Sequence, residues 1–156
     1  MENGMYFYPD QDLHITVIDI LKGEENRSIP QEMKRYINVL EECKRKIHPF
    51  RINAEGITLS SSAVLVKGYY DEELEVFRDE LRKTLKKEGL VLEERYKTVS
   101  CHITIARFTS PLVNPERLLK YAECAHPFGE MPVDSMELVF HNWYDTKKKI
   151  LHNLPL

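Results

Sequence analysis

Two short motifs in the sequence combine the residue types that acid–base chemistry needs. The residues around His14 read Leu-His-Ile-Thr-Val, and those around His102, 88 positions later, read Cys-His-Ile-Thr-Ile. Residues two apart in a β-strand point to the same face, so each motif should present an imidazole beside a threonine hydroxyl. Because the ordinary pKa of histidine is about 6.5, such an imidazole can give or take a proton near neutral pH.

This pairing suits the cleavage of a phosphodiester. The reaction needs a base for the attacking hydroxyl or water, an acid for the leaving oxygen, and donors for the non-bridging oxygens. His14 and His102 are the candidate catalytic pair, and either can be the base. Thr16 and Thr104 are the candidate phosphate-binding residues.

A purely structural role for the motifs and a zinc site are the alternative interpretations. A single strand histidine beside a threonine is ordinarily a partly exposed sheet residue, and only the duplication favours a functional site. A catalytic zinc needs three protein ligands, and no third ligand recurs beside either motif. We therefore expect no metal and no cofactor.

The elements around the motifs alternate between strand and helix patterns. The mixture of hairpins and helices favours an α+β fold with two antiparallel sheets over a doubly wound parallel sheet. The expected elements are a strand at 13–21, a helix at 31–47, a hairpin at 50–70, a helix at 72–88, a strand at 101–108, a helix at 116–125 and a terminal hairpin at 133–154.

Three further residues near these elements could contribute to a site. Tyr8 precedes the first motif and Trp143 ends a strand of the terminal hairpin, so both are candidates for stacking on a base. For each aromatic taken singly, core packing or hairpin pairing is the more ordinary explanation. Arg107 lies at odd spacing from His102, and strict alternation would point it to the opposite face.

Composition limits the class of protein. The 156 residues, 42% of them hydrophobic, suit one domain spanning 1–156. A net charge of −3 argues against binding to duplex DNA. Three scattered cysteines without a CxxC pair fit free thiols in a reducing compartment. With no long apolar run and no secretory signal, we expect a cytoplasmic monomer that does not bind membranes.

The paired motifs and the order of elements resemble the two-histidine (2H) phosphoesterase superfamily, in particular its 2'-5' RNA ligase-like and cyclic phosphodiesterase branches. The signature of this superfamily is a pair of His-x-(Thr/Ser)-apolar motifs. The run Cys-His-Ile-Thr-Ile-Ala-Arg, which begins at Cys101, carries much of the likeness. Relatives often have proline at that position. Many also have a strand and a helix before the first motif, so either the N-terminal lobe is reduced here or the sequence is a fragment.

The resemblance implies a bilobal, pseudo-twofold α+β fold in which each lobe contributes one motif to a cleft between the lobes. It also implies a metal-independent hydrolase acting on a nucleotide or RNA phosphodiester, such as a 2',3'-cyclic phosphate, a 2'-5' linkage or an RNA 3' end. A module of the same fold that binds a nucleotide or RNA end without turnover is the alternative. RNA end joining is the weakest reading, since the chain has no GxxxxGK[ST] motif.

Overall fold

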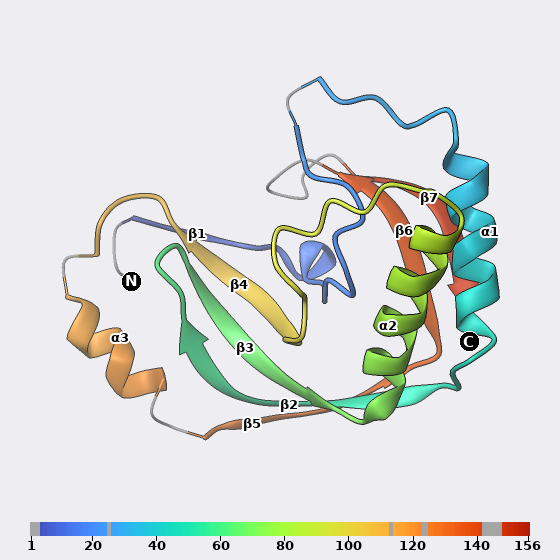
Figure 1. The fold of residues 1–156 in the computed structure, drawn as a ribbon. Coiled ribbons are helices and arrows are strands. Elements are labelled where there is room, and N and C mark those ends of the chain that lie inside the picture. The colour runs from blue at the N-terminus through green and yellow to red at the C-terminus, as the bar shows by residue number, and fades with distance from the viewer. Residues whose placement is uncertain (1–3, 25, 113, 123–124, 142–147) are drawn as a thin grey trace. The chain divides into compact units, whose positions relative to one another are not determined.

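A computed structural model describes residues 4–24, 26–112, 114–122, 125–141 and 148–156 of the chain. Its elements, shown in Figure 1, are β1 (Met5–Phe7), a 3-10 turn (Asp10–Asp12), α1 (Met33–Lys44), β2 (Phe50–Leu59), β3 (Ala63–Tyr70), α2 (Glu72–Lys87), β4 (His102–Phe108), α3 (Pro115–Ala122), β5 (Pro127–Val133), β6 (Ser135–His141) and β7 (Lys148–Pro155). The predicted α+β class with two antiparallel sheets is confirmed.

The chain divides into two compact units. Unit 1 comprises Met1–Thr16, Ile52–Tyr69 and Ser100–Met131. Unit 2 comprises Val17–Arg51, Tyr70–Val99 and Pro132–Leu156. The backbone therefore passes from one unit to the other several times, and two of these passages lie beside the histidine motifs.

Unit 1 contains a five-stranded sheet in the order β1-β4-β3-β2-β5. The predicted hairpin of β2 and β3 is present, and its serine turn closes where the Ser60 amide donates to the Ala63 carbonyl over 2.9 Å. β4 is an interior strand that pairs antiparallel with β1 on one side and β3 on the other. The strand that carries the second motif is thus held from both sides.

One face of this sheet supplies apolar core. Along β2, the buried Ile52 and Ala54 alternate with exposed polar residues, as expected for a strand with one buried face. Val64 and Val66 of β3 are also buried, and Ala106 of β4 has no exposed surface.

Unit 2 is built from two helices and the terminal hairpin, in which β6 and β7 pair antiparallel. α1 packs against α2 and also contacts β7 (Figure 1). Each helix buries residues at three- and four-residue steps, which form one apolar stripe. The stripe of α1 comprises Tyr36, Val39, Leu40 and Cys43, and that of α2 includes Leu74, Phe77, Leu81 and Leu85.

The end of α2 follows the predicted stop signal. Gly89 has φ +66°, a left-handed conformation that glycine adopts without the penalty of a Cβ atom. The amide of Leu90 then donates to the Leu85 carbonyl over 2.9 Å, which satisfies a carbonyl of the last helical turn. The chain leaves the helix here towards the second motif.

Two parts of the secondary structure differ from expectation. The sequence did not predict β5, because proline at both Pro127 and Pro132 is unusual within a strand. β5 is an edge strand of the five-stranded sheet, and an edge strand tolerates proline because one of its sides needs no backbone donors for pairing. The predicted strand over 13–21 is wrong as a regular strand, since Ile15 alone within that range forms a β-bridge.

Within the described part of the chain, no helix is both long and apolar enough to cross a membrane.

Candidate functional site

The two histidine motifs lie next to one another in unit 1. β1 pairs with the end of β4, the chain then loops out through the 3-10 turn, and Ile15 returns to form an antiparallel bridge with Ile103. The loop explains why the predicted first strand is reduced to one bridge. Both motifs are found in unit 1, which differs from the expected contribution of one motif from each lobe.

The bridge fixes which side chains are neighbours. With Ile15 opposite Ile103, antiparallel register puts His14 opposite Thr104 and Thr16 opposite His102. Opposed residues point to the same face, with Cβ atoms roughly 5 Å apart, and diagonal neighbours are separated by roughly 7 to 8 Å. All four motif side chains therefore share one face, with the imidazoles on one diagonal and the hydroxyls on the other.

Each imidazole has a local hydrogen-bond partner. Nδ1 of His14 lies 2.9 Å from the Asp12 carbonyl oxygen. A carbonyl only accepts, so Nδ1 carries the proton and Nε2 is the nitrogen that can take up a second one. Nδ1 of His102 lies 3.4 Å from the Ser100 hydroxyl, which can either donate or accept. The His14 ring therefore has the better defined tautomer.

The motif side chains are accessible enough to meet a ligand. His14 is exposed, whereas Thr16, His102 and Thr104 are half-buried. Ile15 and Ile103, which lie between them, point to the opposite face. Partial burial suits groups that must be both held in place and reached by a substrate.

An irregularity in β4 overturns the sequence prediction for Arg107. Val64 is opposite Ala106, but the next β3 residue, Leu65, is opposite Thr104, so β4 has one extra residue at this point. A bulge of this kind reverses the alternation of faces along a strand. Arg107 therefore shares the face of His102 and Thr104 instead of pointing away from it.

Tyr8 is tied to Arg107. Nε of Arg107 donates to the Tyr8 hydroxyl over 2.8 Å, and the Tyr8 ring makes an edge contact with the Tyr6 ring at 5.2 Å between centroids. Tyr8 is only 8% exposed. Its ring thus has little surface for a base, and its contacts are those of a residue that orients Arg107. The second predicted stacking residue, Trp143, lies outside the described residues.

Three residues of β3 on the face of the motifs were not predicted from the sequence. Lys67 is opposite His102 and Leu65 is opposite Thr104, so the odd-numbered positions of β3 continue the face of the motifs. Tyr69 is the next residue in this series. The alternation of β3 could be recognised in the sequence. The sequence did not show that β4 pairs with β3, nor in which register.

Unit 2 holds the backbone on either side of the motifs through a set of residues that we call the Arg78–Tyr70 clamp (Val17, Tyr70, Arg78 and Val99). Arg78 has no exposed surface, and its Nε donates to the Val17 carbonyl over 2.7 Å. Its guanidinium also donates to the Tyr70 hydroxyl over 3.0 Å. That hydroxyl can in turn donate to the Val99 carbonyl at 2.6 Å.

The clamp joins places that are distant in sequence. Val17 directly follows Thr16, and Val99 lies three residues before His102. Val17, Tyr70 and Val99 are also three of the six residues at which the segments of unit 2 begin or end. One buried guanidinium and one phenol therefore bind the backbone just after the first motif and shortly before the second.

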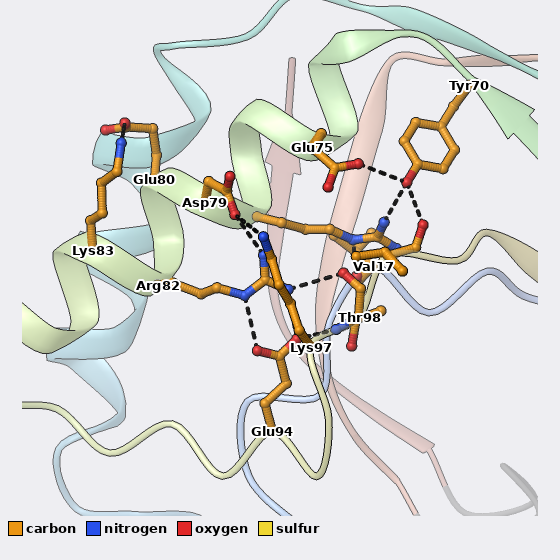
Figure 2. A network of polar contacts seen from close by, with 12 residues as sticks. Val17, Tyr70, Glu75, Asp79, Glu80, Arg82, Lys83, Glu94, Lys97 and Thr98 are labelled. Atoms are coloured by element: carbon orange, nitrogen blue, oxygen red, sulfur yellow. Dashed lines mark hydrogen bonds and ion pairs between the residues drawn. The ribbon is translucent and has the colours of Figure 1, made fainter.

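A second arginine orders the loop before the second motif. Arg82 forms a two-nitrogen ion pair with Glu94, at 2.7 and 2.9 Å, and donates to the Thr98 carbonyl over 3.0 Å (Figure 2). The Thr98 amide donates to the same carboxylate over 2.8 Å. The hydrogen bond from Arg82, the largest influence, lowers the pKa of Glu94 to about 2.

A hollow beside α2 does not suit a phosphate. It is lined largely by carboxylates, which would repel an anion. Its lining comprises Tyr70, Asp71, Glu72, Glu75, Val76, Asp79, Glu80 and Lys83. Across the described ranges, no three His, Cys, Asp or Glu side chains cluster in a way that could hold a metal ion.

Two imidazoles and two hydroxyls thus share one sheet face on adjacent backbone segments, the arrangement that the paired motifs predict. A family model of the 2'-5' RNA ligase superfamily matches residues 1–143, and the chain belongs to this superfamily of 2H phosphoesterases. The predicted resemblance is confirmed.

Among solved structures, the crystal structure of TT0787 of Thermus thermophilus has a similar fold, with a TM-score of 0.66 and 20% sequence identity. The match covers 98% of this chain and 82% of that chain. No curated protein matches the chain.

Proposed function

We propose that the protein is a metal-independent phosphoesterase that cleaves a nucleotide or RNA phosphodiester, with His14 and His102 as acid and base and with Thr16 and Thr104 as phosphate-binding residues. The observation that carries the proposal is the Ile15–Ile103 bridge, whose register gathers the four side chains on one face. Family membership supports the reaction class.

The diagonal arrangement suits the chemistry. A phosphoryl group seated between the imidazoles would have one ring near the attacking oxygen and the other near the leaving oxygen. The threonine hydroxyls on the other diagonal would donate to the non-bridging oxygens, where negative charge increases in the transition state. For a 2',3'-cyclic phosphate, one imidazole removes a proton from water as the new P–O bond forms. The other protonates the ribose oxygen whose bond to phosphorus breaks.

The nearby cations support an anionic substrate. Arg107 of β4 and Lys67 of β3 both lie on the face of the motifs, and Lys67 is opposite His102. Positive charge near the site lowers the free energy of a bound phosphate through Coulomb attraction.

We infer that a small nucleotide or RNA end is the ligand, that the protein acts without a cofactor, and that it works as a cytoplasmic monomer.

The test is product analysis by mass spectrometry in EDTA, with 2',3'-cyclic nucleotides and 2'-5' linked dinucleotides as substrates. His14→Ala and His102→Ala should each lower kcat by roughly 10²- to 10⁴-fold, the usual contribution of general acid–base catalysis. His48→Ala is the matched control, since its side chain is 86% exposed and lies in unit 2. Full activity in either motif variant would overturn the proposed mechanism.

A binding module without turnover is the competing function. It predicts tight nucleotide binding by calorimetry and no product from the wild-type protein after long incubation. The exposed position of His14 is compatible with both functions, and the product assay separates them.

A further inference from the structure

The face that carries the motifs extends across β3. Lys67 is directly opposite His102, and Tyr69 follows two residues later on the same strand. Residues two apart in a strand share a face, so the Lys67 and Tyr69 side chains lie on the side of the sheet that carries the candidate site. β3 thus adds a cation and an aromatic ring beside the second motif.

Lys67 is held near the sheet without a counter-ion. It is half-buried, and a Cβ atom built on Gly56 would lie 2.9 Å from its Cε and 3.1 Å from its Nζ. The lysine side chain therefore runs over Gly56, on the neighbouring strand β2. Within the described ranges its ammonium has neither a hydrogen bond nor an ion pair, although most other half-buried cations of the fold are paired with a carboxylate.

Tyr69 offers an open ring. It is 52% exposed, and its hydroxyl makes no hydrogen bond to any residue that the structure describes. The adjacent Tyr70, by contrast, uses its hydroxyl in the Arg78–Tyr70 clamp. An exposed aromatic ring next to an unpaired cation is the combination with which proteins bind single-stranded nucleotides, the ring on a base and the cation on a phosphate.

We propose that Lys67 and Tyr69 form a subsite for the nucleotide next to the reacting phosphate, with the Lys67 ammonium on its phosphate and the Tyr69 ring on its base. The inference rests on the proposed function and narrows it. The preferred substrate then carries at least two nucleotides and is an RNA end or dinucleotide, not a cyclic mononucleotide.

The experiment compares two substrates that end in the same 2',3'-cyclic phosphate, a mononucleotide and a dinucleotide. Wild-type protein should have the higher kcat/KM on the dinucleotide. In Lys67→Met and in Tyr69→Ala, the ratio of kcat/KM for dinucleotide over mononucleotide should fall roughly tenfold, mainly through KM, because the lost contact belongs to the second nucleotide.

Matched controls come from unit 2. Lys83→Met removes a lysine whose side chain is 72% exposed, and Tyr96→Ala removes a tyrosine that is also 72% exposed. Neither should change the substrate ratio. A uniform effect of the Lys67 and Tyr69 variants on both substrates, or none, would overturn the subsite while leaving the phosphoesterase proposal intact.

Binding provides a readout that does not depend on turnover. In the His102→Ala background, calorimetry should show that adding Lys67→Met or Tyr69→Ala weakens dinucleotide affinity roughly tenfold. If wild type makes no product but these substitutions still weaken binding, the catalytic proposal fails and the subsite stands. If the dinucleotide binds no more tightly than the mononucleotide, the subsite is wrong.

Discussion

At the scale of single residues, the two histidines of the candidate site have different hydrogen-bond partners although their motifs are the same. The Asp12 carbonyl fixes the tautomer of His14, whereas His102 faces a hydroxyl that can reverse its hydrogen bond. The two threonines occupy equivalent places opposite the partner histidines. Substitutions that change a hydroxyl without changing shape can therefore isolate its contribution.

Thr104→Val should lower kcat roughly tenfold or more, because valine keeps the β-branched shape that suits β4 but cannot donate to a phosphate oxygen. Thr104→Ser keeps the hydroxyl and should retain most of the activity. Steady-state kinetics on a 2',3'-cyclic nucleotide measures both variants. Equal activity of the two would show that the Thr104 hydroxyl takes no part.

The sequence could indicate the residue types of the site but not every neighbour. His14, Thr16, His102 and Thr104 were visible because the motif is duplicated. The direction of Arg107 was predicted wrongly, since one extra residue in β4 reverses the strand alternation and leaves no mark in residue type. Lys67 was not found because register between strands is a long-range property.

At the scale of elements, β3 and β4 approach closely where the second motif begins. A Cβ on Gly68 would lie 2.6 Å from Sγ of Cys101 and 3.1 Å from Cγ2 of Ile52. The Gly68 amide also donates to the Cys101 carbonyl over 2.8 Å. A glycine here lets the Cys101 side chain pack against the neighbouring strand.

Gly68→Ala should lower the free energy of unfolding by roughly 1 to 3 kcal/mol, because the added methyl overpacks a buried contact. Adding Cys101→Ala should recover part of that loss by removing the clashing sulfur. Gly23→Ala is a control, since nothing lies within 4 Å of its Cβ position. Urea denaturation measures all variants, and no recovery in the double variant would contradict the packing argument.

The Arg78–Tyr70 clamp is the element-scale feature that connects the two motifs. Its hydrogen bonds act on backbone carbonyls next to the motif segments and not on the motif side chains. Arg78 and Tyr70 are therefore positioning residues. The ring of Tyr70 contributes packing, and its hydroxyl donates to the Val99 backbone carbonyl. Removing the hydroxyl alone therefore separates the hydrogen bond from the packing.

Tyr70→Phe should lower kcat several-fold with a smaller change in KM, because the second motif segment loses one of its tethers. Tyr36→Phe is the matched control, as its hydroxyl donates to the Val91 carbonyl over 2.9 Å, away from the motifs. Each change should cost about 1 kcal/mol of stability. Equal kcat values for both variants would argue against positioning by Tyr70.

Most elements of the fold were predictable because their signals are local. The stripes of α1 and α2, the Gly89 stop and the serine turn of the hairpin all follow from residue type and spacing. The first motif segment was predicted as a full strand, yet its pairing depends on where the 3-10 turn returns the chain to β4. β5 was missed because its prolines conceal an outer strand.

At the scale of the whole molecule, charge pairs contribute to stability in a pH-dependent way. Glu94 is the clearest case, since its side chain is only 11% exposed and it accepts from Arg82 and from the Thr98 amide. Its pKa is lowered from the ordinary 4.5 to about 2. A depressed carboxyl pKa stabilises the folded protein above the unfolded-state pKa, and this contribution is lost as pH falls through the folded-state pKa.

The wild-type protein should therefore lose roughly 3 kcal/mol of unfolding free energy through Glu94 between about pH 5 and pH 2. Glu94→Gln should be less stable at neutral pH and should show a correspondingly smaller fall on acidification. Glu24→Gln, at a carboxylate that is 60% exposed, should change the pH profile little. Thermal unfolding across this pH range, followed by circular dichroism, checks the difference.

The composition of the clamp also determines how kinetic data from this protein can be interpreted. An arginine keeps its charge at all pH values that proteins tolerate, and burial raises the pKa of the Tyr70 hydroxyl above its usual 10. Neither group changes protonation near neutral pH, so the backbone supports of both motifs stay chemically constant across a neutral pH series. The midpoints of an activity profile can then be assigned to the reacting groups, without a correction for a scaffold that titrates with them.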